Sequence, residues 1–198
     1  MPDKEDDQEL IEQVSRSQKY AQLASTLVSR VTKEEAKKHN SPQAIIQSAR
    51  TRLHQLTGAY LAPKLDYTQW LYKFKSLDPN DRLGLESTSL SMMRLHASTY
   101  ERLEVLPTFF QTALASISPV KSVLDLACGL NPLAIPWMPI SDTTEYHACD
   151  IVLPMLQFLD DYAKAFCPST HIFEADILDF KTTQSYDLVM LLKTMPLL

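Results

Sequence analysis

The second half of the chain carries four short apolar runs, spaced as the strands of a parallel β-sheet are spaced. They are SVLDLA (122–127), EYHACD (145–150), HIFEAD (171–176) and YDLVMLLK (186–193). The segments between the runs are long enough for crossover helices, and residues 154–166 have the clearest helical spacing of apolar side chains. Buried strands that alternate with helices are typical of α/β folds. We therefore expect residues 96–198 to form a Rossmann-like α/β domain.

Residues 10–31 predict a long amphipathic helix. Their apolar side chains recur at spacings of three and four, and the helix is expected to continue through KEEAKK to about His39. A second helix should follow it. Ser41 precedes a proline as an N-cap residue does, and Gly58 stands where helices commonly stop.

Further start signals extend the helical region to residue 95. Asp66 is placed to cap a third helix, and Asp78 opens a fourth segment that runs toward Met93. Residues 98–101 fit a capping box for a helix at the start of the α/β domain. Pro107 either kinks that helix or begins a second one. We expect an all-helical domain over residues 1–95.

The net charge of the chain, −5, conceals two halves of opposite sign. Residues 13–95 hold 13 Lys/Arg and 6 Asp/Glu, a net +7, whereas residues 96–198 hold 5 and 12, a net −7. A basic half that stands apart in this way favours contact with a polyanion such as RNA. The alternative is that these cations are ordinary surface residues of helices.

Cysteine usage and hydropathy exclude several classes of protein. Cys128, Cys149 and Cys167 are odd in number and lack CxxC spacing, so neither a disulfide framework nor a zinc site is expected. No apolar run approaches the roughly 20 residues that cross a bilayer, and the N-terminus is acidic where a signal peptide would be basic. We expect a cytoplasmic protein without a metal.

Each of the first three apolar runs contains an acidic residue at or near its end. These residues are Asp125, Asp150 and Asp176. Ligands of open parallel sheets bind beyond the carboxyl ends of the strands, so the three carboxylates are expected to converge on one crevice. Asp150 is placed to accept the ribose hydroxyls of an adenosine, and Asp176 to accept from an adenine amino group. The alternative is that each aspartate only ends a strand or caps a helix.

The loop after the first run, ACGLNP, limits the choice of nucleotide cofactor. Gly129 alone remains of a glycine-rich pattern, and the whole chain has 3 glycines. A pyrophosphate needs several backbone amides at close approach, so NAD is disfavoured, and the GK[ST] of a Walker A motif is missing. S-adenosylmethionine (SAM) asks for one close glycine passage. Asn131 and Pro132 are placed to cap a short helix. A tight turn without any ligand is the alternative.

Several strings together carry a family resemblance. They are QSARTRLHQLTGAY (47–60), HASTYERL (96–103), SVLDLACGLNPLAIPWM (122–138), ACD (148–150), ADIL (175–178) and LLKTMP (191–196). Over most of residues 40–198 the chain resembles the Arm/Rmt family of aminoglycoside-resistance 16S rRNA methyltransferases. The resemblance implies a class I SAM-dependent methyltransferase domain behind a helical RNA-binding domain. It also implies methylation of guanine N7 in the decoding site of the small ribosomal subunit.

The resemblance further implies a set of cofactor-binding residues. They are His96, Ala97, Ser98, Thr99, Tyr100, Glu101, Arg102, Ala127, Gly129, Asp150, Asp176, Ile177 and Leu192. Arg102 would pair with the carboxylate of the SAM methionine tail, a bidentate role in which lysine is a poor substitute. Family members often have arginine at the position of Tyr100, so the role of this tyrosine is open.

The implied partner is 16S rRNA within the 30S subunit, bound by a monomer. The candidate RNA-binding cations are Lys19, Arg30, Lys33, Lys37, Lys38, Arg50, Arg52, Lys64, Lys73 and Lys75. Methylation of N7 needs no catalytic acid or base, because N7 has a lone pair and no proton. A thiolate mechanism through Cys128 is the disfavoured alternative, because this residue lies in the cofactor turn.

Two other functions stay open from the sequence: methylation of another RNA site or of a small molecule, and a non-catalytic fragment that only binds SAM or RNA. The second has a concrete motive. Class I methyltransferases build a seven-stranded sheet, whereas the apolar runs account for strands one to four. We therefore expect an incomplete methyltransferase domain over residues 96–198, truncated at the C-terminus.

Overall fold

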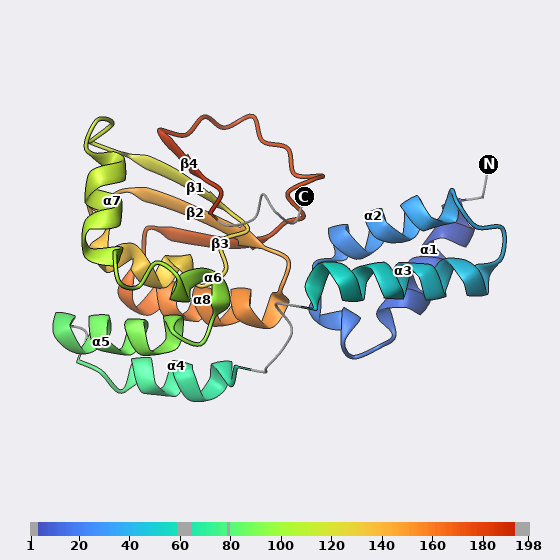
Figure 1. Ribbon diagram of the computed structural model, residues 1–198, viewed down its shortest axis with the longest axis horizontal. Helices are drawn as coiled ribbons and strands as arrows, with labels where there is room; N and C mark the ends of the chain where they lie inside the picture. The colour runs from blue at the N-terminus through green and yellow to red at the C-terminus, as the bar shows by residue number, and fades with distance from the viewer. Residues whose placement is uncertain (1–3, 59–64, 79, 193–198) are drawn as a thin grey trace. The chain divides into compact units, whose positions relative to one another are not determined.

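The computed structural model describes residues 4–58, 65–78 and 80–192. The chain divides into two compact units, and Figure 1 shows the elements of each. The first comprises residues 1–64 with 151–153 and 174–180, and the second comprises residues 65–150, 154–173 and 181–198. The helical residues 65–95 thus belong with the sheet, whereas the sequence led us to expect a division near residue 95.

The first unit contains helices α1 (Lys4–Ser15), α2 (Ser25–Ala36) and α3 (Pro42–Thr57), with a 3-10 turn η1 (Tyr20–Gln22) between the first two. The prediction of one continuous helix from residue 10 to about residue 39 is wrong. The chain leaves the helix because tertiary bonds compete with it. Tyr20 donates its hydroxyl to the Arg50 carbonyl at 2.9 Å, and Ala24 donates its amide to the Ile151 carbonyl at 2.8 Å.

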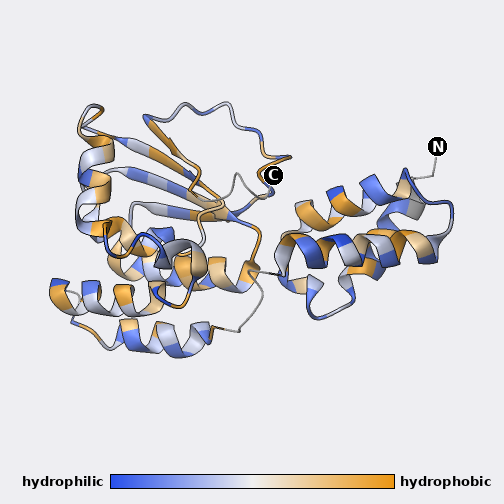
Figure 2. Ribbon diagram, viewed as in Figure 1, coloured by the Kyte–Doolittle hydropathy of each residue, from blue (hydrophilic) through white to orange (hydrophobic). Residues whose placement is uncertain are grey.

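The core of this unit lies among the three helices. It consists of Val14, Tyr20, Leu23, Leu27, Val28, Val31, Ala49 and Leu53. Figure 2 shows apolar and polar residues alternating along these helices, as amphipathic helices require. The predicted start of α3 is confirmed, because the Ser41 hydroxyl accepts from the Ala44 amide at 3.3 Å.

The second unit contains a four-stranded sheet in the order β3-β2-β1-β4. Its strands are β1 (Ser122–Leu126), β2 (Glu145–Asp150), β3 (Thr170–Glu174) and β4 (Leu188–Met190). β1 pairs in parallel with β2 and with β4, so the sequence prediction of a parallel sheet is confirmed. β4 begins later than predicted, because the Asp187 carboxylate accepts from the amides of Lys121 and Ser122 at 2.8 and 3.0 Å in place of a ladder bond.

Helices pack beside this sheet in the second unit. They are α4 (Tyr67–Lys75), α5 (Arg82–Met93), α6 (Ala97–Tyr100), α7 (Leu106–Leu114), the 3-10 helix η2 (Asn131–Trp137) and α8 (Leu153–Phe166). Phe74 of α4 is buried, and its ring meets that of Tyr162 on α8 edge-on at 5.1 Å between centroids. No helix of the described residues is both long and apolar enough to cross a membrane.

The helix start signals had mixed outcomes. Asp66 caps α4 as predicted, accepting from the Gln69 amide at 2.9 Å. The cap of α5 is Asp81, whereas Asp78 accepts from the Asn80 amide. The prediction that the fourth helix opens at Asp78 is therefore wrong, although the helix itself is present. Near Pro107 a second helix does begin, because α7 starts at Leu106. The short α6 and the longer α7 therefore replace one kinked helix.

Candidate cofactor-binding site

The turn after β1 is fixed to the end of β2. Ala127 and Gly129 both have positive φ, 49° and 53°, and reverse the chain. Cys128 donates its amide to the Cys149 carbonyl at 2.9 Å, and Gly129 donates its amide to Oδ2 of Asp150 at the same distance. The aspartate that was predicted to bind ribose therefore also holds the turn.

The segment before α6 lies against this turn. A Cβ atom at Gly129 would stand 3.0 Å from Cε1 of His96 and 3.3 Å from Oγ of Ser98. Only glycine combines this close approach with a positive φ, so the glycine brings residues 96–98 and the turn together. The capping box predicted for residues 98–101 is wrong. His96 is the N-cap of α6, and the Ser98 hydroxyl bonds to Nδ1 of His96 at 2.8 Å instead.

Asp125 lies at the centre of a buried polar network. Only 1% of this residue is exposed, and its Oδ2 accepts from the Tyr146 hydroxyl at 2.6 Å and from Nδ2 of Asn131 at 2.8 Å. Nη2 of Arg102 approaches Oδ1 of Asn131 at 3.5 Å, a long contact. Asn131 was predicted to cap the short helix, which is wrong, because its side chain turns inward to the aspartate while Leu130 is the N-cap of η2.

Two buried polar atoms of this network have no hydrogen-bond partner among the described residues: Oδ1 of Asp125 and Nε of Arg102. Buried polar groups are normally paired, so an unpaired acceptor and an unpaired donor mark places for ligand atoms. The α-amino acid tail of SAM carries an ammonium and a carboxylate, one group for each. These residues fit the methionine end of that cofactor.

Burial and charge set the protonation of the site. Burial raises the pKa of the Asp125 carboxyl to about 6, although the hydrogen bonds from Tyr146 and Asn131 and the charge of Arg102 oppose the rise. Burial, followed by the charges of Asp150 and Asp125, raises the pKa of the Cys128 thiol well above its usual value. Cys128 therefore stays a thiol at neutral pH and is a poor nucleophile.

The other predicted cofactor-binding residues differ in burial and in the unit to which they belong. Thr99 is buried and donates to the Met93 carbonyl at 2.7 Å, whereas Tyr100 is 61% exposed. Asp176 belongs to the first unit, where Nε of Arg30 donates to its Oδ2 at 2.6 Å. Leu192 is half-buried near the end of the described chain.

Sequence reasoning missed Tyr146 and the inward role of Asn131. A signal was present, because a charged residue inside an apolar strand needs polar partners. Tyr146 lies on the neighbouring strand β2. In the register of the sheet it is paired with Val123, which precedes Asp125 by two residues on β1. Its pairing with Asp125 requires the register of β1 on β2, which the sequence alone does not supply.

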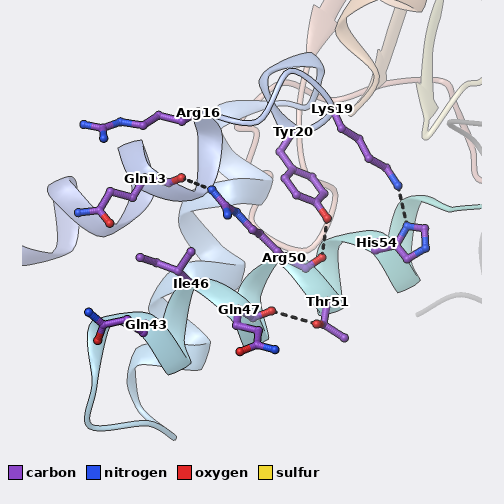
Figure 3. A pocket seen from close by; sticks show the side chains of 10 residues that line it. All are labelled: Gln13, Arg16, Lys19, Tyr20, Gln43, Ile46, Gln47, Arg50, Thr51 and His54. Carbon is purple, nitrogen blue, oxygen red and sulfur yellow. Dashed lines mark hydrogen bonds between the residues drawn. The ribbon is translucent and has the colours of Figure 1, made fainter.

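The first unit carries a groove among α1, η1 and α3 with a volume of about 710 Å³ (Figure 3). Four of its lining residues are basic: Arg16, Lys19, Arg50 and His54. Nη2 of Arg50 donates to the Gln13 carbonyl at 2.6 Å, and Nζ of Lys19 lies 2.7 Å from Nδ1 of His54. Nε of Arg50 is buried and has no partner among the described residues. The groove can therefore attract an anion.

Other predicted RNA-binding cations are engaged in ion pairs. Lys38 and Arg52 both bond to Oε1 of Glu35, at 2.7 and 3.0 Å, and Ser48 donates to Oε2 at 2.7 Å. The bonds from Lys38 and Ser48 lower the pKa of the buried Glu35 carboxyl to about 2, with a further contribution from Arg52. These two cations thus stabilise the fold.

The remaining candidate cations differ in their surroundings. Lys33, Lys37 and Lys75 are exposed, and Nζ of Lys73 stands 4.2 Å from the centre of the Trp70 ring. Lys64 lies outside the described residues. Among the residues that the structure describes, no group of three or more His, Cys, Asp or Glu side chains could hold a metal ion.

A family model described as "Ribosomal RNA methyltransferase (FmrO)" matches residues 16–198. The chain belongs to this family. It is 33% identical over 189 residues to a 16S rRNA (guanine(1405)-N(7))-methyltransferase of Micromonospora echinospora, covering 93% of this chain and 69% of the relative. A protein of the same description from Serratia marcescens is 33% identical over 182 residues, 92% of this chain and 66% of the relative.

Solved structures agree with this FmrO family membership. The 16S rRNA methylase RmtB superposes with a TM-score of 0.73 at 28% identity, over 96% of this chain and 73% of RmtB. The 16S rRNA methyltransferase RmtF, solved in complex with S-adenosyl-L-homocysteine, gives 0.73 at 27% identity, over 98% and 72%. The fold is therefore that of a class I SAM-dependent methyltransferase with a helical N-terminal region, as the sequence predicted.

Proposed function

We propose that this FmrO-family protein transfers a methyl group from SAM to N7 of a guanine in the decoding site of 16S rRNA, and thereby confers aminoglycoside resistance. Its relatives are named for N7 methylation of guanine 1405, and RmtF was solved with the demethylated cofactor. The observation that carries the proposal is a pair of buried atoms on Asp125 and Arg102 that have no partner among the described residues and that match the two charges of the SAM tail.

The cofactor site follows from this pair. Arg102 binds the carboxylate of the methionine tail, Asp125 binds its ammonium, and Gly129 allows the close passage beside the turn. Asp150 accepts from the ribose. The remaining proposed contacts with SAM come from residues 96–101, Ala127, Asp176, Ile177 and Leu192. When bound, SAM supplies an electrophilic methyl group.

The residues of the protein then have to orient the guanine and the cofactor and to exclude water, and they do not have to move protons. Guanine N7 has a free lone pair and no proton, so the reaction needs alignment of this atom with the methyl group and no general base. The protonated thiol of Cys128 suits such a site, because it does not compete for the methyl group. The catalytic contribution is therefore positional.

The RNA-binding part of the proposal rests on the basic first unit. The groove with Arg16, Lys19 and Arg50 and the exposed Lys33 and Lys37 are suited to phosphates of folded rRNA, which proteins recognise mainly by shape. The substrate in the proposal is the assembled 30S subunit, and the protein acts on it as a monomer in the cytoplasm. The ion-paired Lys38 and Arg52 serve the fold instead.

Purified protein, assembled 30S subunits and SAM test the proposal directly. We expect one new N7-methylguanine in the decoding site, detected by borohydride reduction and aniline cleavage, and little of it with Arg102→Ala. Methyl transfer to another nucleotide would assign a different RNA target. Cofactor binding without any methylated RNA would contradict the proposed enzyme.

A further inference from the structure

The Tyr146 hydroxyl contacts the buried Asp125 carboxylate more closely than any other described group does. It donates to Oδ2 at 2.6 Å, and Nδ2 of Asn131 bonds both to the same oxygen at 2.8 Å and to the hydroxyl at 3.3 Å. Tyr146 is 1% exposed, so its hydroxyl is buried together with the carboxylate. Both donors meet one oxygen, and Oδ1 is left without a partner among the described residues.

Such an arrangement fixes the plane and the charge of the carboxylate together. Two donors on Oδ2 prevent rotation of the group, so Oδ1 is kept for another ligand. A hydrogen bond to a charged acceptor also stabilises the charged form, whereas burial disfavours that form. Loss of the tyrosine hydroxyl would raise the pKa of the Asp125 carboxyl further, because burial already raises it to about 6 with the tyrosine present.

We propose that Tyr146 is a positioning residue for cofactor binding: its hydroxyl keeps Asp125 ionised and oriented toward the ammonium of the SAM tail. This inference rests on the proposed function. Tyr146 itself does not touch the cofactor in this account, and its effect passes through Asp125. The alternative is that the hydroxyl only satisfies a buried acid, in which case its loss would lower stability without altering how ligand binding depends on pH.

The test has to distinguish the titration of Asp125 from the effects of other charged and titratable groups near it. The charge of Arg102 favours the carboxylate, and that of Asp150 opposes it. The phenol of Tyr146 and the thiol of Cys128 have pKa values raised well above their usual ranges by burial, so both stay neutral in the assay. His96 lies beside the same turn, and a variant that neutralises Asp125 alone separates the effect of Asp125 from that of His96.

The experiment measures the affinity of the full chain for S-adenosyl-L-homocysteine by calorimetry from about pH 5 to pH 7, a range in which the α-amino group of the ligand stays mainly protonated. The variants are Tyr146→Phe, which removes one hydroxyl, and Tyr162→Phe as matched control, a fully buried tyrosine on α8. For the wild type we expect about tenfold weaker binding at pH 5 than at pH 7, as Asp125 protonates.

Tyr146→Phe should move this transition upward by about one pH unit and weaken binding at pH 7 about twofold. Tyr162→Phe should keep the wild-type profile. Equal profiles for Tyr146→Phe and the wild type would overturn the positioning role. The carboxyl ¹³C shift of Asp125, followed by NMR in the ligand-free protein, gives the same answer without a cofactor: its titration must move upward in Tyr146→Phe.

Asp125→Asn covers the case in which Tyr146→Phe does not fold, because it keeps the shape of the network and removes the titration. Its affinity should vary less than about twofold between pH 5 and pH 7. A wild-type profile in this variant would assign the pH dependence to Asp150 or His96 and overturn the proposal. Wild-type protein that binds no S-adenosyl-L-homocysteine at any pH would overturn the proposed function, whereas the NMR titration would still report on Tyr146.

Discussion

Nε of Arg30 donates to Oδ2 of Asp176 at 2.6 Å, and both side chains are largely buried, 14% and 5% exposed. The sequence assigned them separate roles, one toward rRNA phosphate and the other toward the cofactor adenine. Within the first unit they form one ion pair, to which Glu34 adds a contact with Arg30 at 3.1 Å. Leu178 donates its amide to the other carboxylate oxygen of Asp176 at 3.1 Å, so this acid is held in place on both sides.

We predict that Arg30→Ala lowers the free energy of unfolding by about 3 kcal/mol, because it leaves a buried carboxylate without its cation. Urea denaturation at neutral pH measures the change. Arg82→Ala is the control, since Arg82 pairs with Glu86 at 2.9 Å and its side chain is 75% exposed. We expect a loss below about 1 kcal/mol there. Similar losses in the two variants would show that the Arg30 pair is worth no more than a surface pair.

A second prediction separates binding cations from structural ones. Lys19→Ala and Arg16→Ala should each weaken binding to 30S subunits and reduce the slope of log affinity against log salt by about one. Lys38→Ala is the matched lysine control, because Lys38 is paired with Glu35. Filter binding at several salt concentrations gives the slopes. An unchanged slope in the two groove variants, or an equal loss in Lys38→Ala, would contradict this division.

In the turn after β1, we predict opposite changes in stability for substitutions at Gly129 and at Ala127. Gly129→Ala should destabilise the protein by about 1–2 kcal/mol and weaken cofactor binding, because it adds a methyl group at positive φ against His96. Ala127→Gly should stabilise it by up to about 1 kcal/mol, since Ala127 already has φ of 49°. Thermal denaturation compares the two. A loss of stability in Ala127→Gly as large as in Gly129→Ala would refute the backbone argument.

We predict that the ionised Glu35 carboxylate makes the stability of the protein depend on pH in the acid range. Lys38, Ser48 and Arg52 hold the pKa of its carboxyl at about 2 in the folded protein, below the ordinary glutamate value of 4.5. Its contribution is therefore complete above about pH 4.5 and is lost as the pH falls toward 2. We expect Glu35→Gln to cost about 2 kcal/mol at pH 7 and to flatten the fall in stability from pH 5 to pH 3.

Ser48→Ala gives this prediction a graded control. It removes one of the donors to Glu35, the hydroxyl at 2.7 Å, and keeps the carboxylate. The slope of unfolding free energy against pH, taken from urea denaturation, should lie between those of the wild type and Glu35→Gln. Identical slopes for all three proteins would assign the acid sensitivity to other carboxylates.

Local sequence patterns predicted where most strands and several helix starts lie. The four apolar runs became strands, and Ser41 and Asp66 cap the helices that follow them. Where a local signal competed with a tertiary bond, it failed. Ser98 bonds to His96 and does not begin a helix, and the helix from residue 10 ends early because Tyr20 bonds to the Arg50 carbonyl.

The sequence by itself determined the alternation of strands and helices, the single-glycine turn and the family, because these depend on residue type and spacing along the chain. Only the tertiary structure decided that Tyr146 and Asn131 hold Asp125, that Arg30 is paired with Asp176, and that Arg52 belongs to the Glu35 network. Each of these depends on strand register or helix packing, which join residues distant along the chain. The charge of a side chain is thus readable from the sequence, whereas the atom that it contacts is not.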